Sequence, residues 1–180
     1  MRRWGERGGT RVRRFAGAGV TLLLVVWAAT AAFAQGTSSI QPGQAVGTWR
    51  LGQDVTQLVT TLGPIHSEDD IPGSSLTGYY WPLKRIGAIA DKTTKKIVAL
   101  VVSLDEGYRT DKGVSAGTDL DAVRTAYGHE DSVDSHQDDD TLVYDTLGVA
   151  FVVDKSGALG SRVSVIFVFG SGQYKNIFEQ

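Results

Sequence analysis

The chain has 180 residues, 22 of them glycine and none cysteine, with a formal charge of −2. This composition is that of an ordinary globular protein, and it excludes a disulfide-stapled mini-domain, a thiolate metal centre and a disordered tail protein. Residues 1–34 hold six Arg and one Glu, so the 12 basic and 19 acidic residues from position 35 onward give that part a charge of −7. Because this charge would repel a polyanion, we expect no nucleic acid among the partners.

The first 34 residues have the pattern of a secretory signal. A cationic segment ends at residues 11–14, and the apolar run of residues 15–34 closes in Ala32-Phe33-Ala34, which a signal peptidase accepts. A retained membrane anchor is the alternative, because about 20 apolar residues can span a bilayer. The run is rich in Gly and Ala and no stop-transfer cluster follows it. We therefore predict cleavage after Ala34, a periplasmic or secreted protein, and no stable membrane anchor after cleavage.

Residues 35–45 are predicted to form an extended lead before the first folded repeat. An internal repeat follows, in which matching residues are 65 positions apart. The matched pairs are Gly52 and Gly117, Asp54 and Asp119, Val55 and Leu120, Leu58 and Val123, Leu62 and Tyr127, and Gly63 and Gly128. The pattern predicts two similar halves, residues 46–107 and 108–180.

Each half is predicted to begin with a short amphipathic helix of about nine or ten residues. In the first half Val55, Leu58, Val59 and Leu62 form one apolar stripe. Gly63 follows, at the position where a left-handed residue commonly ends a helix. A helix this short is not stable alone, so it needs the sheet that the following residues form.

Three strands are predicted after each helix. They comprise residues 79–81, 87–90 and 97–104 in the first half, and 142–144, 148–151 and 163–169 in the second. The last strand of each half is apolar on both faces, which is typical of central strands. The predicted fold class is α+β, with two tandem repeats of a short helix and a three-strand antiparallel meander, and with the helices on one face of the sheet.

Each half has, in order, an apolar-Gly-(Gln/Thr)-Asp helix start, a helix-ending glycine and three strands. This order resembles a known superfamily. It is similar to the small exported domains that include the outer-membrane assembly lipoprotein BamE (the SmpA/OmlA family). The tandem form resembles the beta-lactamase inhibitory protein in architecture. The resemblance covers about residues 46–170 and implies a binding protein without cofactors, and it transfers no site residue to this chain.

The strongest candidate for a metal site is the segment of residues 129–140, which holds His129, His136 and six acidic residues. Imidazole and carboxylate groups suit Zn or Mn, and clustered carboxylates suit Ca. The spacing matches neither an EF-hand loop nor a helical His-x-x-x-His pair. A solvated loop also explains it, and residues 65–70 form a similar polar segment. We predict no metal site and no cofactor.

Catalytic motifs are scarce. The sequence lacks a Gly-x-Ser-x-Gly elbow, and the glycine-flanked Ser171 more often ends a strand than performs acyl transfer. We expect that the chain is not an enzyme, and a small exported hydrolase or metal-dependent enzyme is the alternative.

The predicted function is an exported, non-enzymatic protein-binding module, inhibitor-like or envelope-associated, with a partner in the envelope or extracellular space. A cell-envelope assembly or structural factor is a further alternative. Because interfaces are enriched in aromatic residues, we expect an exposed aromatic cluster on the sheet face opposite the helices, flanked by acidic loops at residues 68–70 and 138–140. The predicted binding residues are Tyr79, Trp81, Tyr144, Phe167 and Phe169. A place in the helix-side core is the alternative role for these rings.

Overall fold

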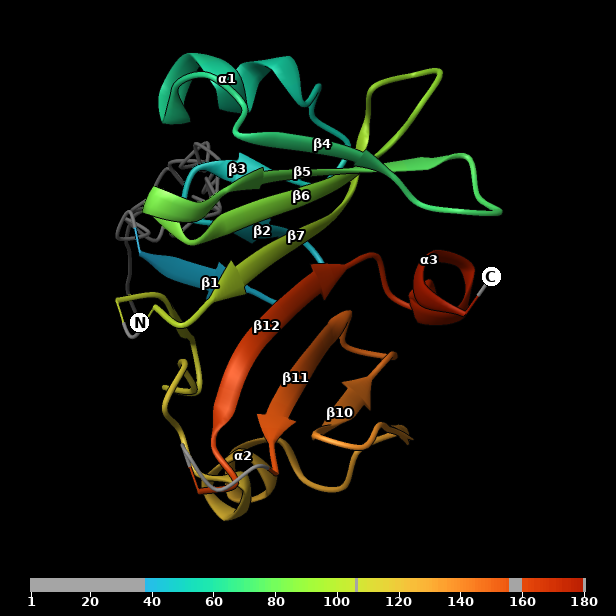
Figure 1. Ribbon diagram of the computed structural model, residues 1–180. Helices are drawn as coiled ribbons and strands as arrows, with labels where there is room; N and C mark the ends of the chain where they lie inside the picture. The colour runs from blue at the N-terminus through green and yellow to red at the C-terminus, as the bar shows by residue number, and fades with distance from the viewer. Residues whose placement is uncertain (1–37, 106, 156–159, 180) are drawn as a thin grey trace, which may run out of the picture. The chain divides into compact units, whose positions relative to one another are not determined.

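The structure, a computed structural model, describes residues 38–105, 107–155 and 160–179 (Figure 1). The predicted signal segment and its cleavage site lie outside these residues. Within the described part, no helix is long and apolar enough to cross a membrane.

In chain order the elements are β1 (Ser39–Gln41), β2 (Ala45–Val46), β3 (Trp49–Arg50), α1 (Thr56–Leu62), β4 (Ser67–Asp70), β5 (Leu76–Trp81), the 3-10 helix η1 (Pro82–Lys84), β6 (Ile86–Asp91), β7 (Ile97–Ser103), β8 (Arg109–Thr110), α2 (Leu120–Tyr127), β9 (Ser132–Ser135), β10 (Asp139–Tyr144), β11 (Val149–Asp154), β12 (Val163–Phe169) and α3 (Tyr174–Phe178).

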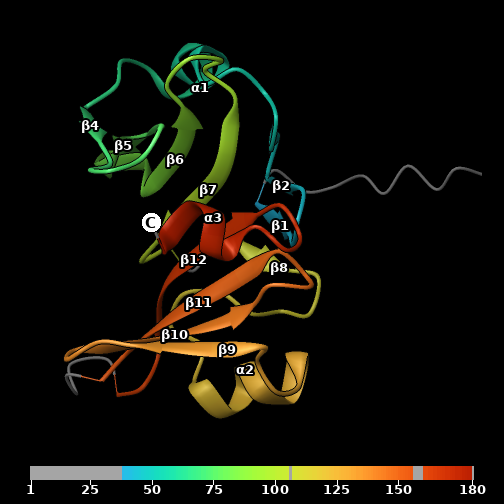
Figure 2. The ribbon, with the colours of Figure 1, turned by 90° about the vertical axis from the view of Figure 1, so that its right-hand side faces the viewer.

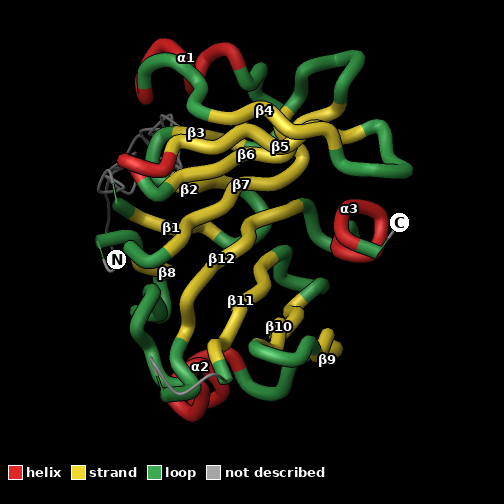
Figure 3. Tube along the Cα trace, in the orientation of Figure 1, coloured by secondary structure: helices red, strands yellow, loops and turns green. Residues whose placement is uncertain are grey.

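An eight-stranded antiparallel sheet forms most of the described part. Its strand order is β4-β5-β6-β7-β12-β11-β10-β9, so β7 and β12 lie at its centre and β4 and β9 at its edges (Figure 3). The central strands pair Phe167 with Val101. Both central strands are apolar on successive residues, as is typical of interior strands.

One face of this sheet, the helix face, is closed by α1, α2 and a second, four-stranded sheet. The second sheet has the order β3-β2-β1-β8, with β1 and β8 parallel. Leu58 of α1, Val123 of α2 and Ile40 of β1 belong to the same buried cluster as Leu100 and Ile166 of the central strands. This cluster is the larger of the two cores.

The opposite face, the α3 face, is only partly covered. Tyr174 and Ile177 of α3 are buried together with Phe169 of β12. The rings of Phe167 and Phe178 lie 4.9 Å apart, and those of Phe169 and Tyr174 lie 5.6 Å apart. Figure 2 shows α3 crossing in front of the middle of the sheet.

The last turn of α1 and that of α2 are each held by a hydrogen bond from an aromatic residue of the strands that follow. The indole nitrogen of Trp81 donates a hydrogen bond to the carbonyl oxygen of Gly63 at 3.0 Å. The hydroxyl of Tyr144 donates one to the carbonyl oxygen of Gly128 at 2.9 Å. Both glycines have positive φ, +91° and +81°, which confirms their predicted role as helix ends.

The predicted α+β fold class is wrong, because the protein is mostly β, with twelve strands in two sheets and three short helices in the described part. The six predicted strand segments lie in strands, apart from their end residues Leu104 and Gly148. Four strands of the large sheet, rather than three, follow α1 and α2, because the acidic segments predicted as loops contain the edge strands β4 and β9. β4 and β9 show no apolar alternation because most of their side chains are exposed to water on both faces. The second sheet and α3 were not predicted.

Candidate functional site

The structure does not gather the five predicted binding aromatics into an exposed cluster. Tyr79, Trp81 and Tyr144 are 4%, 3% and 2% exposed and lie in the core under the helix face. Phe169 is fully buried and Phe167 half-buried on the opposite face, where α3 packs on both. The period of two identifies residues that share a face, but it does not say which face other elements cover. These rings are therefore core residues, and the expected exposed cluster is wrong.

A different set of side chains occupies the part of the α3 face that α3 leaves uncovered. We call Tyr80, Val101, Val152 and Val165 the open patch. Tyr80 on β5 pairs with Gly87 on β6, and Gly87 pairs in turn with Val101 on β7. Val165 on β12 pairs with Val152 on β11. Tyr80 is 37% exposed and the three valines are half-buried. The open patch therefore presents an apolar surface that continues from β5 across the centre of the sheet.

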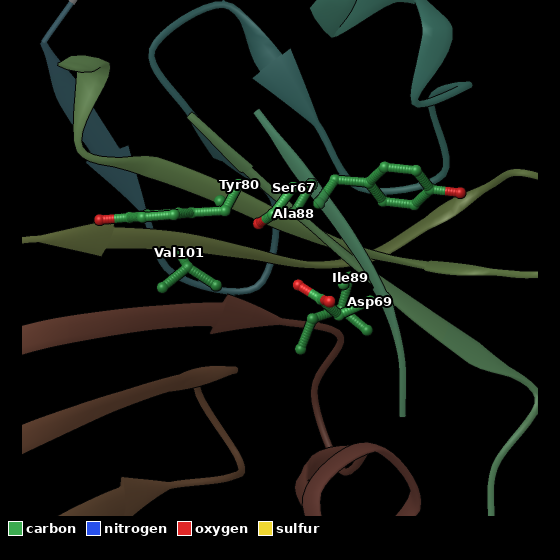
Figure 4. Close-up of a pocket in the computed structure, with 9 residues that line it drawn as sticks. Ser67, Asp69, Tyr80, Ala88, Ile89 and Val101 are labelled. Atoms are coloured by element: carbon green, nitrogen blue, oxygen red, sulfur yellow. The ribbon is translucent and has the colours of Figure 1, made fainter. Parts of the chain in front are cut away.

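The ring of Tyr80 lies beside Gly87, which has no side chain. A Cβ atom added to Gly87 would lie 3.5 Å from Cδ2 of this ring, which is an ordinary van der Waals distance, so the ring packs beside the glycine. The hydroxyl of Tyr80 is 3.2 Å from Oγ of Ser103. A shallow cavity of about 190 Å³ adjoins Tyr80 and Val101 and is also lined by Asp69 (Figure 4). This arrangement gives the open patch a fixed aromatic side chain next to a hollow.

Carboxylates flank the open patch on two sides. Asp69 on the edge strand β4 is exposed and lines the same cavity as Tyr80. Asp154 follows Val152 by two positions on β11, so it faces the same side of the sheet.

Three other carboxylates of the predicted acidic loops form ion pairs. The ion pairs are Glu68 with Lys95 at 3.9 Å, Asp70 with Lys92 at 3.4 Å and Asp140 with Lys155 at 2.9 Å. These carboxylates belong to strands rather than to the predicted loops, and each contacts a lysine of a neighbouring turn.

The candidate metal segment, residues 129–140, is divided between a turn and two strands. Within the described ranges, no group of three His, Asp or Glu side chains is placed to hold a metal ion. Glu130 instead accepts two hydrogen bonds from the guanidinium of Arg124, at 2.7 and 3.2 Å. Oδ2 of Asp131 accepts hydrogen bonds from the amide and the hydroxyl of Thr146, at 2.9 and 3.1 Å. Two of its carboxylates therefore hold α2 and the turn after β10 in place.

The pair of Arg124 and Glu130 leads to a pH-dependent prediction. The hydrogen bond from Arg124 holds the pKa of Glu130 below its ordinary value of 4.5. The pair therefore stabilises the fold above that ordinary value, and the contribution is lost as the pH falls through the folded-state pKa. We expect Glu130→Gln to lower the free energy of unfolding at pH 7, and the difference from the wild type to shrink as the pH approaches 3. Urea unfolding across this range measures it, and a pH-independent difference would contradict the assignment.

The glycine-flanked serine lies in the turn between β12 and α3. The hydroxyl of Ser171 donates a hydrogen bond to the carbonyl oxygen of Thr146 at 2.8 Å. A backbone carbonyl is not a general base, so this contact fixes the turn and does not activate the hydroxyl. The absence of enzymatic activity stays a prediction.

Comparisons with known proteins do not give a family. No protein-family model and no curated protein matches the sequence. Among solved structures, a cysteine-rich secretory protein from Staphylococcus aureus subsp. aureus Mu50 aligns with 74% of this chain and 49% of its own, at 16% identity and a TM-score of 0.44. The uncharacterized protein yfeY from Escherichia coli aligns with 74% of this chain and 99% of its own, at 14% identity and a TM-score of 0.46. The chain thus spans about half the length of the staphylococcal protein, and the resemblance to BamE and the beta-lactamase inhibitory protein stays a prediction.

Proposed function

We propose that this chain acts after export as a non-enzymatic, cofactor-free binding protein whose open patch docks a protein partner. The proposal is carried by the unequal cover of the two faces of the eight-stranded sheet. The helix face is closed by two helices and the second sheet, whereas α3 covers only part of the opposite face. Tyr80 and the three valines of the open patch keep apolar surface in contact with water, and removing that surface from water favours association.

The surroundings of the open patch specify the chemistry of the partner. Interfaces combine an apolar centre with a polar rim, and here the exposed carboxylate of Asp69 belongs to that rim. The residues from position 35 onward carry a charge of −7 in total. A partner with an apolar surface bordered by Lys or Arg would therefore be attracted at long range and matched at contact. We place this partner in the cell envelope or the extracellular space.

Tyr80→Ala tests the open patch directly. An aromatic anchor at the centre of an interface typically contributes about 2 kcal/mol or more, so we expect the variant to bind the partner about 30-fold more weakly. Because Tyr80 is 37% exposed, the melting temperature should fall little. The chain is immobilised and used to capture proteins from envelope and medium fractions of the source cell. The dissociation constant of each captured protein is then measured for wild type and variant.

A matched pair of valine variants provides the control. Val165→Thr places a hydroxyl in the open patch and should weaken binding. Val133 on β9 is 44% exposed and pairs with Leu142, a residue of the helix-face core, so it lies on the opposite face. Val133→Thr makes the same chemical change there and should leave binding unchanged. If Tyr80→Ala and Val165→Thr bind every captured protein as tightly as Val133→Thr does, the proposal is wrong.

A further inference from the structure

The hollow beside Tyr80 has a glycine at its centre. Gly78 on β5 pairs with Asp69 on β4 and with Ile89 on β6, so these three positions face the same side of the sheet. Tyr80 follows Gly78 by two positions on β5 and faces that side as well. These residues and Gly87 line the shallow cavity of about 190 Å³ that Figure 4 shows. We call this cavity the glycine hollow.

Neither the backbone nor the packing requires a glycine at position 78. The φ of Gly78 is not positive, so a residue with a side chain could adopt the same conformation. Among the described residues, the one atom within 4 Å of an added Cβ would be the carbonyl oxygen of Asp69, at an ordinary 3.7 Å. A glycine inside a strand weakens the strand, and it often marks a place where another group approaches closely. Gly78 leaves the hollow unfilled, which suits a group that approaches from outside the chain.

Asp69 gives the glycine hollow a negative charge that its neighbours on β4 do not share. Glu68 and Asp70 lie on the other face of the strand by the period of two. There Glu68 contacts Lys95 and Asp70 contacts Lys92. Asp69 is exposed, and within the described ranges its carboxylate takes part in no hydrogen bond or ion pair. The hollow therefore combines an apolar floor with a carboxylate that is available to a cation.

We propose that the glycine hollow receives an arginine side chain of the protein partner. This inference rests on the proposed function, because it identifies the group by which the partner of the open patch is recognised. The aliphatic stem of the arginine lies over Gly78 and Gly87, and its guanidinium donates two parallel hydrogen bonds to the carboxylate of Asp69. The hollow has about six times the volume that one water molecule occupies in the liquid, which accommodates a long side chain but not a folded segment.

The preference for arginine over lysine follows from the two groups that flank the stem. A guanidinium stacks on aromatic rings and is more weakly hydrated than the ammonium group of lysine. Its flat fork of N–H donors also matches a carboxylate, whereas an ammonium group is a point charge. Tyr80 offers the ring and Asp69 the carboxylate, and both line the same cavity.

Short peptides test the glycine hollow without the partner. The probe is Ala-Ala-Arg-Ala-Ala with both ends blocked, and two control peptides carry lysine or citrulline in place of arginine. Citrulline has nearly the shape of arginine and no charge. Each peptide is titrated into the isotope-labelled full chain, and the amide shifts are followed by NMR. We expect the arginine peptide to shift the amides of Asp69, Gly78 and Gly87 with a dissociation constant in the millimolar range. The lysine peptide should bind several-fold more weakly, and the citrulline peptide about ten-fold more weakly.

Variants of the chain show which residues bind the guanidinium. Asp69→Asn should weaken binding of the arginine peptide about ten-fold. Asp121→Asn makes the same change at an exposed position of α2, on the helix face, and should leave binding unchanged. Gly78→Ala adds a methyl group to the floor of the hollow and should weaken binding several-fold. It should not lower the melting temperature, because alanine replaces a glycine that the strand does not need.

The outcomes separate this inference from the proposed function. Equal binding of the arginine and citrulline peptides overturns the inference, and so does the absence of shifts at the hollow. A captured protein that Tyr80→Ala releases, but that Asp69→Asn and Gly78→Ala both retain, supports docking on the open patch and overturns the arginine contact. If the arginine peptide binds as expected and no captured protein depends on Tyr80, the hollow is an arginine site and the proposed function is wrong.

Discussion

Replacing Gly148 with alanine is expected to lower the free energy of unfolding by about 3 kcal/mol or more. A Cβ atom at this position would lie 2.3 Å from the carbonyl oxygen of Phe169 and 2.7 Å from Cα of Gly43. Both are backbone atoms, so a side-chain rotation cannot relieve the clash, and overpacking typically costs about 1–3 kcal/mol. The φ of Gly148 is +72°, which adds about 1–2 kcal/mol for a residue with a side chain.

The reason for this close approach is that three segments meet at Gly148. Its carbonyl oxygen accepts hydrogen bonds from the amides of Gly43 and Phe169, both at 3.0 Å. It therefore joins the turn between β1 and β2 to the end of β12. Gly52→Ala is the matched control for urea unfolding, because Gly52 has a φ of +78° but nothing within 4 Å of an added Cβ. Equal losses in the two variants would contradict the crowding at Gly148.

Trp81→Ala is expected to destabilise the fold by about 3–5 kcal/mol, the usual cost of removing a buried aromatic side chain. Trp81 is 3% exposed, in the core under the helix face. Its indole nitrogen also holds the carbonyl oxygen of Gly63, so the end of α1 loses its partner from the sheet. Thermal and urea unfolding of the purified variant measure the loss.

Two further variants separate the contributions at Trp81. Trp81→Phe keeps most of the apolar volume and removes the hydrogen bond, so part of the loss should be recovered. Tyr80→Ala removes an aromatic ring from the neighbouring position on the other face, where the ring is 37% exposed. If Tyr80→Ala destabilised the protein as much as Trp81→Ala, the assignment of Trp81 to the core and of Tyr80 to the surface would be wrong.

The elements that could be predicted from the sequence are those whose hydrophobic pattern or glycine position reflects their place in the fold. The segments at residues 97–104 and 163–169 are apolar on both faces because they form the centre of the sheet, and Gly63 and Gly128 mark helix ends by their conformation. The edge strands gave no such signal, since acidic side chains on an edge strand remain in water. The two- and three-residue strands of the second sheet are too short to show a period. The five-residue α3 has no stability of its own and forms by packing on Phe169.

Along β5, the face that was expected to be exposed is buried, and the exposed face is offset from it by one residue. Tyr79 and Trp81 share a face, as the period of two predicts, but that face is the one the helices cover. The residue between them, Tyr80, lies on the other side and belongs to the open patch. One sequence signal was available, because Gly87 begins the predicted strand that follows, and a glycine in a strand often marks close approach by another group. Its pairing with Tyr80 depended on a register that only the tertiary structure gives.

The acidic edge of the sheet has a consequence for self-association. An exposed strand edge is a template on which another chain can add its own strand, the first step toward a fibril. In β4 the consecutive carboxylates of Glu68, Asp69 and Asp70 occupy such an edge, so a second copy that approached by the same edge would meet like charges. The hydrogen bond from Thr77 lowers the pKa of Asp70, which keeps this edge charged further into the acidic range. Resistance to polymerisation at this edge therefore depends on pH, and it would be lost first in strongly acidic surroundings.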